Sequence, residues 1–116
     1  MNYTVNDLTV ILNKAQQAAV NASEQAYQQN GNSDWDACGF AWVDIYEYDG
    51  VKLKGNTKMG KALKAAGIDQ NWNRVFSQWC NWYGGQSISI KEAGARAYAR
   101  VLEGYGFTAY AGSRLD

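Results

Sequence analysis

Lysine side chains gather in one short segment, where they could bind an anion. Five lysines and no acidic residue stand between residues 52 and 64: Lys52, Lys54, Lys58, Lys61 and Lys64. The segment KLKGNTKMGK includes the start of an expected helix, whose free backbone amides also favour an anion such as phosphate. It does not match the phosphate-loop pattern GxxxxGK[ST]. Three interpretations stay open: a solvated face paired with nearby acids, a contact for anions or nucleic acid, and a surface for a protein partner.

Large aromatic side chains are the second group that could act at a binding surface. Four of them crowd into residues 72–83: Trp72, Trp79, Trp82 and Tyr83. Tryptophan and tyrosine anchor many protein interfaces, and they also stack on nucleotide bases. The alternative is that they fill the core of a small sheet. Because five tryptophans exceed what a core of this size needs, we expect at least one to be exposed.

The sequence offers little for catalysis or for metal binding. It has no histidine, which excludes a Ser-His-Asp triad and leaves neither cysteine an activating base. Cys38 and Cys80 do not form a CxxC pair, and we expect reduced, half-buried thiols in strands, with a disulfide as the alternative. The acids between residues 34 and 49 match no calcium-binding loop. We therefore expect no enzyme, no metal and no cofactor.

Charge is unevenly distributed along a chain whose formal net charge is zero. Residues 1–51 contain seven acidic residues and one lysine. In residues 52–64 all five charged residues are lysines. Zero net charge gives no global attraction to nucleic acid or membranes. The apolar runs fall far short of the roughly 20 residues of a membrane span, and residues 1–9 do not resemble a signal peptide. The expected location is the cytoplasm.

The first segment has the features of a long helix over residues 4–29. Thr4 is the expected N-cap, with Asp7 in the first turn, and Asn30-Gly31 is a stop signal. Apolar residues recur at spacings of three and four: Val5, Leu8, Leu12, Ala15, Ala19, Ala22 and Ala26. This stripe either packs on the protein's own sheet or forms the seam of a homodimer.

The middle of the chain alternates strand and helix patterns. Residues 38–46 predict a central strand covered at least in part on both faces, and residues 51–55 a short edge strand. A helix starts after Asn56-Thr57 and ends at Gly67, with Ile68 in apolar contact behind it. Residues 69–73 predict a loop and residues 75–83 a strand, followed by a possible hairpin turn at Gly84-Gly85.

The stretch GGQSISIKEAGARAYARVLEGYGFTAYAGS predicts a third helix and a last strand. Ser89 and Glu92 have the spacing of a capping box, with Ile88 as hydrophobic staple. A close helix contact is expected at Gly94, and Gly104 and Gly106 stop the helix before a strand at residues 107–111. The expected buried face is Ala93, Ala97, Tyr98, Val101 and Leu102.

These elements predict an α+β or small α/β fold in one domain of 116 residues. Three to four short strands form one sheet with about three helices. The long helix within residues 1–30 comes first, and residues 37–116 form the mixed core.

Three segments together resemble a group of small proteins encoded by tailed bacteriophages and prophages. They are CGFAWVDIY, KGNTKMGKALKAAGI and KEAGARAYARVLEGYGFTAYAGSRLD, the last matching a C-terminal form EAGAxAYAxVLxxxGxxAYAGSRLD. The resemblance covers residues 37–116 and carries no catalytic residues. It implies a phage gene expressed in a bacterial cell, and such accessory proteins often bind and block a host protein, including host defence systems.

The leading hypothesis is therefore a phage-encoded, non-enzymatic binding protein that modulates or inhibits a host or phage component. Its surface would combine the aromatics of residues 72–83 with the lysines of residues 52–64. One alternative is a nucleic-acid or nucleotide binding protein. Another is a virion component assembled through the apolar stripe. The expected state is a monomer, or a homodimer through the N-terminal helix, without a membrane partner.

Overall fold

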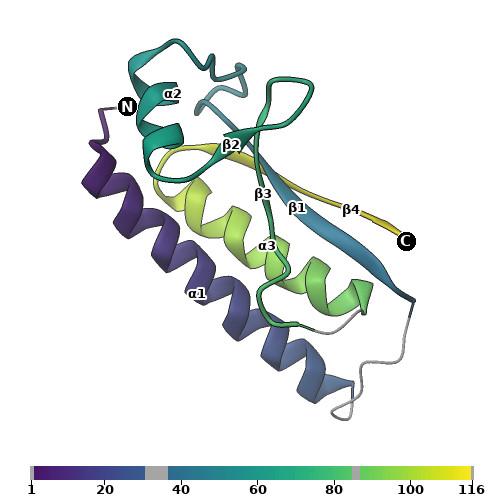
Figure 1. Ribbon diagram of the computed structural model, residues 1–116. Coiled ribbons are helices and arrows are strands. Elements are labelled where there is room, and N and C mark those ends of the chain that lie inside the picture. Colours follow the sequence, from purple (N-terminus) through teal and green to yellow (C-terminus); the bar gives the residue numbers. More distant parts are fainter. Residues whose placement is uncertain (1, 31–36, 85–86, 116) are drawn as a thin grey trace.

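The computed structural model describes residues 2–30, 37–84 and 87–115, and it has the expected α+β fold with a long helix first (Figure 1). The elements are α1 (Val5–Gln29), β1 (Gly39–Tyr46), α2 (Lys58–Ala65), β2 (Asp69–Gln70), β3 (Phe76–Trp79), α3 (Ile88–Gly104) and β4 (Thr108–Leu115). The four strands form one antiparallel sheet in the order β2-β3-β1-β4. No helix among these residues is both long and apolar enough to cross a membrane.

Strand β1 is the centre of the sheet, as its apolar sequence predicts. It pairs with β3 on one side and, over its whole length, with β4 on the other. From β1 onwards the elements follow a β-α-β-β-α-β order in which β3 lies between β1 and β2, which is the split β-α-β arrangement. One face of the sheet packs on α3, and no helix of the described residues covers the other face (Figure 1).

The apolar stripe of α1 packs mainly on α3 (Figure 1). The sequence predicted that this stripe packs on the sheet, and that prediction is wrong. The stripe packs on a helix instead, because α3 already covers the strands. The buried residues of α1 are Leu8, Ile11, Leu12, Ala15, Ala19 and Ser23. Val5 at the start of the stripe is exposed, and Ala22 and Ala26 are half-buried. The residues expected to form a dimer seam are thus largely used within one chain.

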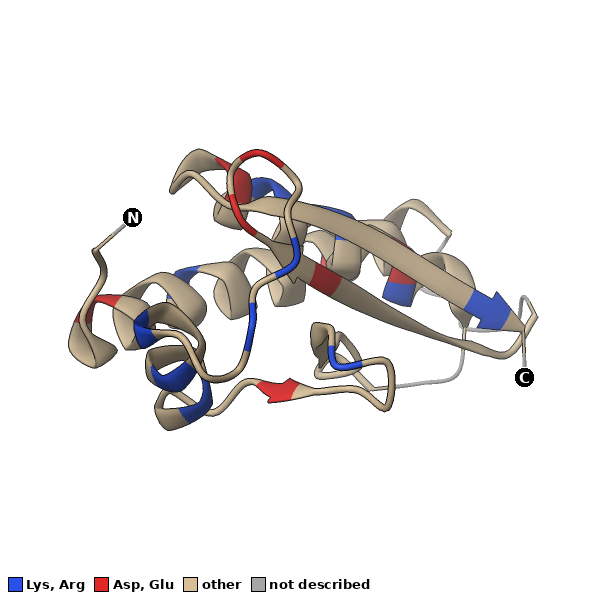
Figure 2. Cartoon of the chain, turned by 90° about the horizontal axis from the view of Figure 1, so that it is seen from above, with Lys and Arg blue, Asp and Glu red and all other residues tan. Residues whose placement is uncertain are grey.

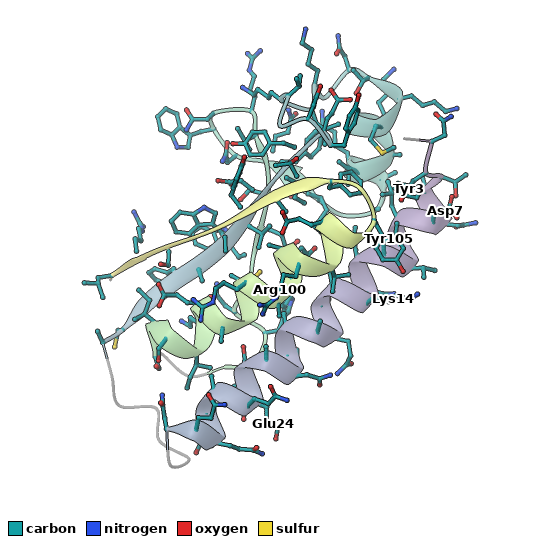
Figure 3. All side chains as sticks on the ribbon, turned by 180° about the vertical axis from the view of Figure 1, so that it is seen from behind. Tyr3, Asp7, Lys14, Glu24, Arg100 and Tyr105 are labelled. Atoms are coloured by element: carbon teal, nitrogen blue, oxygen red, sulfur yellow. The ribbon has the colours of Figure 1, made fainter. Side chains whose placement is uncertain are left out.

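The start of α1 is fixed by the predicted cap and by contacts with the end of α3. The Thr4 hydroxyl accepts from the Asp7 amide at 3.1 Å, and the Thr4 amide donates to the Asp7 carboxylate at 3.0 Å. The Tyr3 hydroxyl donates to the Tyr105 carbonyl, and Lys14 Nζ donates to the Tyr105 hydroxyl at 2.9 Å (Figure 3). Lys14 therefore helps to join α1 to the residue that follows α3.

Helix α2 has both of its predicted ends. The Thr57 hydroxyl accepts from the Gly60 amide at 3.1 Å. After the helix, Gly67 adopts a φ of 103°, and the Ile68 amide donates to the Leu63 carbonyl at 3.0 Å. Only glycine takes such a φ without a steric penalty, so this left-handed stop is set by the sequence.

Four predictions about the sheet need correction. Residues 51–55 form no strand: the Val51 carbonyl accepts from the Glu47 amide at 2.9 Å and the Lys54 carbonyl from the Thr57 amide at 3.2 Å, so this segment takes part in turns instead. Part of the expected loop at residues 69–73 is β2, paired with β3. The expected strand at residues 75–83 is limited to Phe76–Trp79, whereas the last strand extends to Leu115 along β1. The turn expected at Gly84-Gly85 falls partly outside the described residues.

The predicted capping box of α3 is wrong. The helix begins at Ile88, with Ser87 as N-cap but no side-chain cap bond, so Ser89 and Ile88 lie inside the helix. The Ile88 amide donates to the Ala37 carbonyl at 2.8 Å, and this contact with the segment before β1 sets the helix start. Glu92 instead accepts from the Ser113 hydroxyl at 2.6 Å, linking α3 to β4.

The buried face of α3 is broader than predicted. It contains the expected Ala97, Tyr98 and Leu102, whereas the expected Ala93 and Val101 are only half-buried. The helix ends at Gly104 and is followed by Gly106, which has a φ of 97°, as the sequence predicts.

Gly94 of α3 lies in a close contact with α1, as predicted. A Cβ atom at this position would lie 2.6 Å from Ser23 Oγ and 3.2 Å from the Ala19 carbonyl oxygen. Ser23 Oγ is itself buried and donates to the Ile90 carbonyl at 3.1 Å. A side chain at position 94 would therefore disturb both the packing and this hydrogen bond.

We expect Gly94→Ala to lower the free energy of unfolding by about 1–3 kcal/mol, because overpacking outweighs the better helix propensity of alanine. Gly104→Ala is the matched control, since no atom lies within 4 Å of its added Cβ, and it should be neutral or slightly stabilising. Urea unfolding of both variants measures the difference. Equal stability of the two variants would contradict close packing at Gly94.

Candidate functional site

The β2–β3 hairpin carries the most exposed tryptophan of the described chain on a well-ordered loop. The Arg74 amide donates to the Asn71 carbonyl at 2.8 Å, and the Asn71 amide donates to the Val75 carbonyl at 2.8 Å. The Asn71 side-chain oxygen accepts from the amides of Asn73 and Val75 at 2.9 and 3.1 Å. These bonds define a three-residue hairpin loop, which presents Trp72 with 91 % of its surface exposed.

Arg74 ends this loop with a φ of 62°, the one positive φ at a described residue other than glycine. A side chain in this left-handed conformation costs about 1 kcal/mol relative to glycine. The hairpin holds the backbone there, since the Gln70 side-chain amide donates to the Arg74 carbonyl at 2.9 Å. Arg74 is thus a cation held at a position that favours glycine.

One side of the hairpin borders an aromatic pocket of about 570 Å³. Its walls include three tryptophans, one cation and several polar side chains: Trp42, Gly67, Asp69, Gln70, Asn71, Trp72, Ser77, Gln78, Trp79 and Arg114. Trp79 keeps 53 % of its surface exposed and meets Trp42 edge to face, with 5.5 Å between ring centroids. A planar, unsaturated group could stack here, with amide and hydroxyl groups beside it.

The other side of the hairpin borders a basic pocket of about 800 Å³. Its lining carries five cations and no acidic residue: Lys52, Leu53, Lys54, Gly55, Asn56, Lys61, Lys64, Gln70 and Arg74. Gln70 lines both pockets, so the two are neighbours. Figure 2 shows basic residues on α2 and the segment before it, and acidic residues on the loop that follows β1.

Specific contacts hold the residues of the basic pocket together between α2 and the hairpin. Lys52 Nζ donates to the Asn73 carbonyl at 2.7 Å, which joins the lysine segment to the loop of the hairpin. A Cβ at Gly55 would lie 2.7 Å from Lys64 Nζ and 2.6 Å from the side-chain oxygen of Gln70. Glycine at position 55 thus lets these two side chains approach the chain at the pocket.

The structure brings together six of the nine predicted site residues. Lys52, Lys54, Lys61 and Lys64 line the basic pocket, and Trp72 and Trp79 line the aromatic pocket. Lys58 lines neither pocket. Lys58 directly follows Thr57, whose hydroxyl already accepts from the Gly60 amide at the start of α2. The pocket lining therefore does not single out the helix N-terminus as its anion contact.

Trp82 and Tyr83 belong to a different part of the molecule. Trp82 stacks on Tyr98 of α3 with 5.5 Å between ring centroids, and Tyr83 lies against Tyr27 of α1 at 6.0 Å. These contacts give both side chains a packing role. The expectation that at least one tryptophan is exposed is confirmed by Trp72, Trp79 and Trp82.

Sequence reasoning missed several residues that complete the site. Arg74 lies far from the lysines in sequence, and Trp42 and Arg114 come from the other two strands. The sequence alone gives little indication that these residues belong to the site. Only the register of the sheet places Trp42 opposite Trp79 and beside Gly112. Ring packing is the reason for that glycine, since a Cβ at position 112 would lie 2.6 Å from the Trp42 ring.

The face of the sheet that carries no helix is lined by aromatic side chains. Alternation along β1 buries Gly39, Ala41, Val43 and Ile45 and leaves the intervening residues half-buried. The strand register then places five aromatics on this open face: Phe40, Trp42, Tyr46, Trp79 and Tyr110. Burial raises the pKa of the Tyr46 phenol, with smaller contributions from Asp44 and Tyr110.

The two cysteines differ in exposure. Both are free thiols, as expected, but Cys38 is exposed and Cys80 buried, and neither lies within a named strand. Burial raises the pKa of the Cys80 thiol from 9.0 to about 12. The described residues also contain no group of three acidic or cysteine side chains placed to hold a metal ion.

We expect thiol reagents to label Cys38 but not Cys80 in the folded protein at pH 8. In Cys38→Ser, native labelling should be nearly absent and should appear in urea.

Because the unfolded Cys80 thiol ionises at lower pH than the folded one, the free energy of unfolding should fall as pH rises from 9.0 towards about 12. The contribution is at most about 1.4 kcal/mol per pH unit. Urea unfolding at several pH values measures this dependence in the wild type and in Cys80→Ala. If the free energy of unfolding falls with pH equally steeply in both, the Cys80 thiol is not the cause.

We expect Arg74→Gly to leave the fold intact and to raise the free energy of unfolding by up to about 1 kcal/mol. The hydrogen bonds that shape the loop use the backbone of residue 74, so glycine retains them while it removes the cation. Urea unfolding measures the change. A loss of more than about 1 kcal/mol would show that the arginine side chain itself holds the hairpin.

The hairpin surface, defined by the residues that line the two pockets, combines a basic recess with a tryptophan-lined one. Such a surface can bind an anionic partner that also offers planar groups for stacking. Comparisons of the chain with protein-family models, with curated proteins and with solved structures find no match.

Proposed function

We propose that this chain is a non-enzymatic binding protein that uses the hairpin surface to engage an anionic host or phage component and thereby modulates it. The observation that carries the proposal is the meeting of five cations and three tryptophans at the two sides of one hairpin. The resemblance to phage-encoded proteins supports an origin in a bacteriophage and action in the bacterial cytoplasm.

Electrostatics supports an anionic partner. The basic pocket has no acid in its lining, so the charges of Lys61, Lys64 and Arg74 reinforce one another there. A cluster of one sign raises the association rate with a partner of opposite charge, and it disfavours basic partners. The zero net charge of the whole chain confines this attraction to one surface.

Trp72 supplies the second element of recognition. Its ring is 91 % exposed, yet the loop below it is held by the bonds of Asn71. An exposed aromatic on an ordered loop loses little conformational entropy on binding, and such residues often dominate interface energies. The lysines would orient the partner, and Trp72 would slow its release.

We expect affinity capture from a bacterial lysate to retain a component through the hairpin surface. The test compares the tagged wild-type chain with a double variant, Lys61→Glu with Arg74→Gly. Since the double variant places an acid in the basic pocket and removes its arginine, retention should fall at least about tenfold. Mass spectrometry and nucleic-acid staining identify and quantify what is retained.

Lys58→Glu is the matched control, because it changes a lysine of α2 to the same acid outside both pockets. It should retain the component as the wild type does. Equal retention by the double variant, or equal loss in Lys58→Glu, would refute the proposal for this surface.

A further inference from the structure

The open face of the sheet consists of aromatic and polar side chains without aliphatic ones. Besides the five aromatics, the register places Asp44, Asp69, Ser77, Thr108, Gly112 and Arg114 on it. Protein interfaces are also rich in aromatic residues and arginine, so the rings by themselves do not identify the partner. What the face offers is ring surfaces surrounded by hydrogen-bonding groups, next to the basic pocket.

The rings on this face are held in place by one another. Trp79 meets both Phe40 and Trp42 edge to face, with ring centroids 6.0 and 5.5 Å away. Tyr46 and Tyr110 form a second edge-to-face pair at 5.6 Å. In an edge-to-face pair, one ring points its edge at the flat surface of the other. The flat surfaces of the first ring therefore remain available for stacking with a ligand.

Cations border the aromatic part of the face. The guanidinium carbon of Arg114 lies 5.9 Å from the centroid of the Phe40 ring, and Arg114 lines the aromatic pocket with Trp72 and Trp79. At the other border Gln70 joins this pocket to the basic one. Flat rings next to a cluster of cations match a ligand that alternates planar bases with phosphates.

We propose that the anionic partner is a single-stranded nucleic acid, whose bases stack on Trp72 and Trp79 while its phosphates contact the lysines of the basic pocket. This inference rests on the function proposed above and names its ligand class. A single strand is favoured over a duplex because paired bases hide their flat surfaces. It is favoured over an acidic protein because the aromatic and basic pockets adjoin through Gln70, which suits a ligand that carries a planar base and a phosphate in every repeat unit.

The acids on this face limit where the phosphates can run. Asp44 and Asp69 lie on it, and the aromatic pocket includes Asp69, whereas the basic pocket has no acid. Phosphates should therefore follow the basic pocket, and bases should lie on the tryptophan side. The affinity should then depend on both pockets at once.

The experiment titrates the purified full chain with labelled oligonucleotides of about 12 nucleotides and mixed sequence. The probes are single-stranded DNA, single-stranded RNA, the matching duplex, and inorganic polyphosphate as an anion without bases. We expect a single-stranded probe to bind and to quench tryptophan fluorescence. For about four phosphate contacts, affinity should fall about 50-fold between about 50 and 200 mM salt.

Trp72→Ala is the test variant, and it should weaken single-strand binding at least about fivefold. Because Trp72 is almost fully exposed, its removal should not affect folding, which circular dichroism checks. Tyr48→Ala is the matched control, since Tyr48 is another highly exposed aromatic and lines neither pocket. It should bind as the wild type does.

The outcomes separate this inference from the proposed function. The inference is supported if single-stranded DNA or RNA binds more tightly than the duplex and polyphosphate do, and if Trp72→Ala weakens this binding at least about fivefold. The single strand that binds better identifies the preferred sugar. Equal binding of polyphosphate or duplex, or no effect of Trp72→Ala, overturns it. No binding of any oligonucleotide at low salt also overturns it. If lysate capture is still lost in the Lys61→Glu, Arg74→Gly variant, the proposed function stands with an acidic protein as partner.

Discussion

The structure depends on the position of β1, which is buried on one face and paired along both edges. Its residues Ala41, Val43 and Ile45 are almost fully buried on the helical side, and both of its edges are hydrogen-bonded. Helix α3 packs on this strand, and buried Lys91 ties the two together by donating to the Gly39 carbonyl at 2.9 Å. Burial of such apolar side chains contributes about 1.5–3 kcal/mol each. Helix α1 packs on α3, and β3 and β4 pair with β1, so these three elements are positioned directly by this pair.

The same alternation that forms the core also creates the open face. A strand has side chains on two sides, so the residues between the buried ones must face away from α3. In β1 these include Phe40, Trp42 and Tyr46, which pack against aromatics of the neighbouring strands. The core and the open face are therefore coupled, because a one-residue shift in register would exchange the side chains of the two faces.

Local signals in the sequence predicted most of the elements and part of the site. Thr4, Thr57 and Gly67 act at helix ends through contacts within a few residues, and their roles are as predicted. The expected box at Ser89 failed because a contact from Ala37, distant in sequence, sets the start of α3. Four lysines and two tryptophans of the expected site line its pockets, whereas Trp82 and Tyr83 pack against helices.

The sequence by itself determined the composition of the surface: a lysine-only segment, a tryptophan-rich segment and strands of alternating burial. These follow from residue types and short spacings, which act through local backbone geometry. Only the tertiary structure decided that Arg74 and Lys61 line one recess, and that Trp42 and Arg114 join Trp72 at another. Such pairings depend on strand order and on how α2 packs beside the hairpin. They arise from burial summed over the whole chain, which no single segment records.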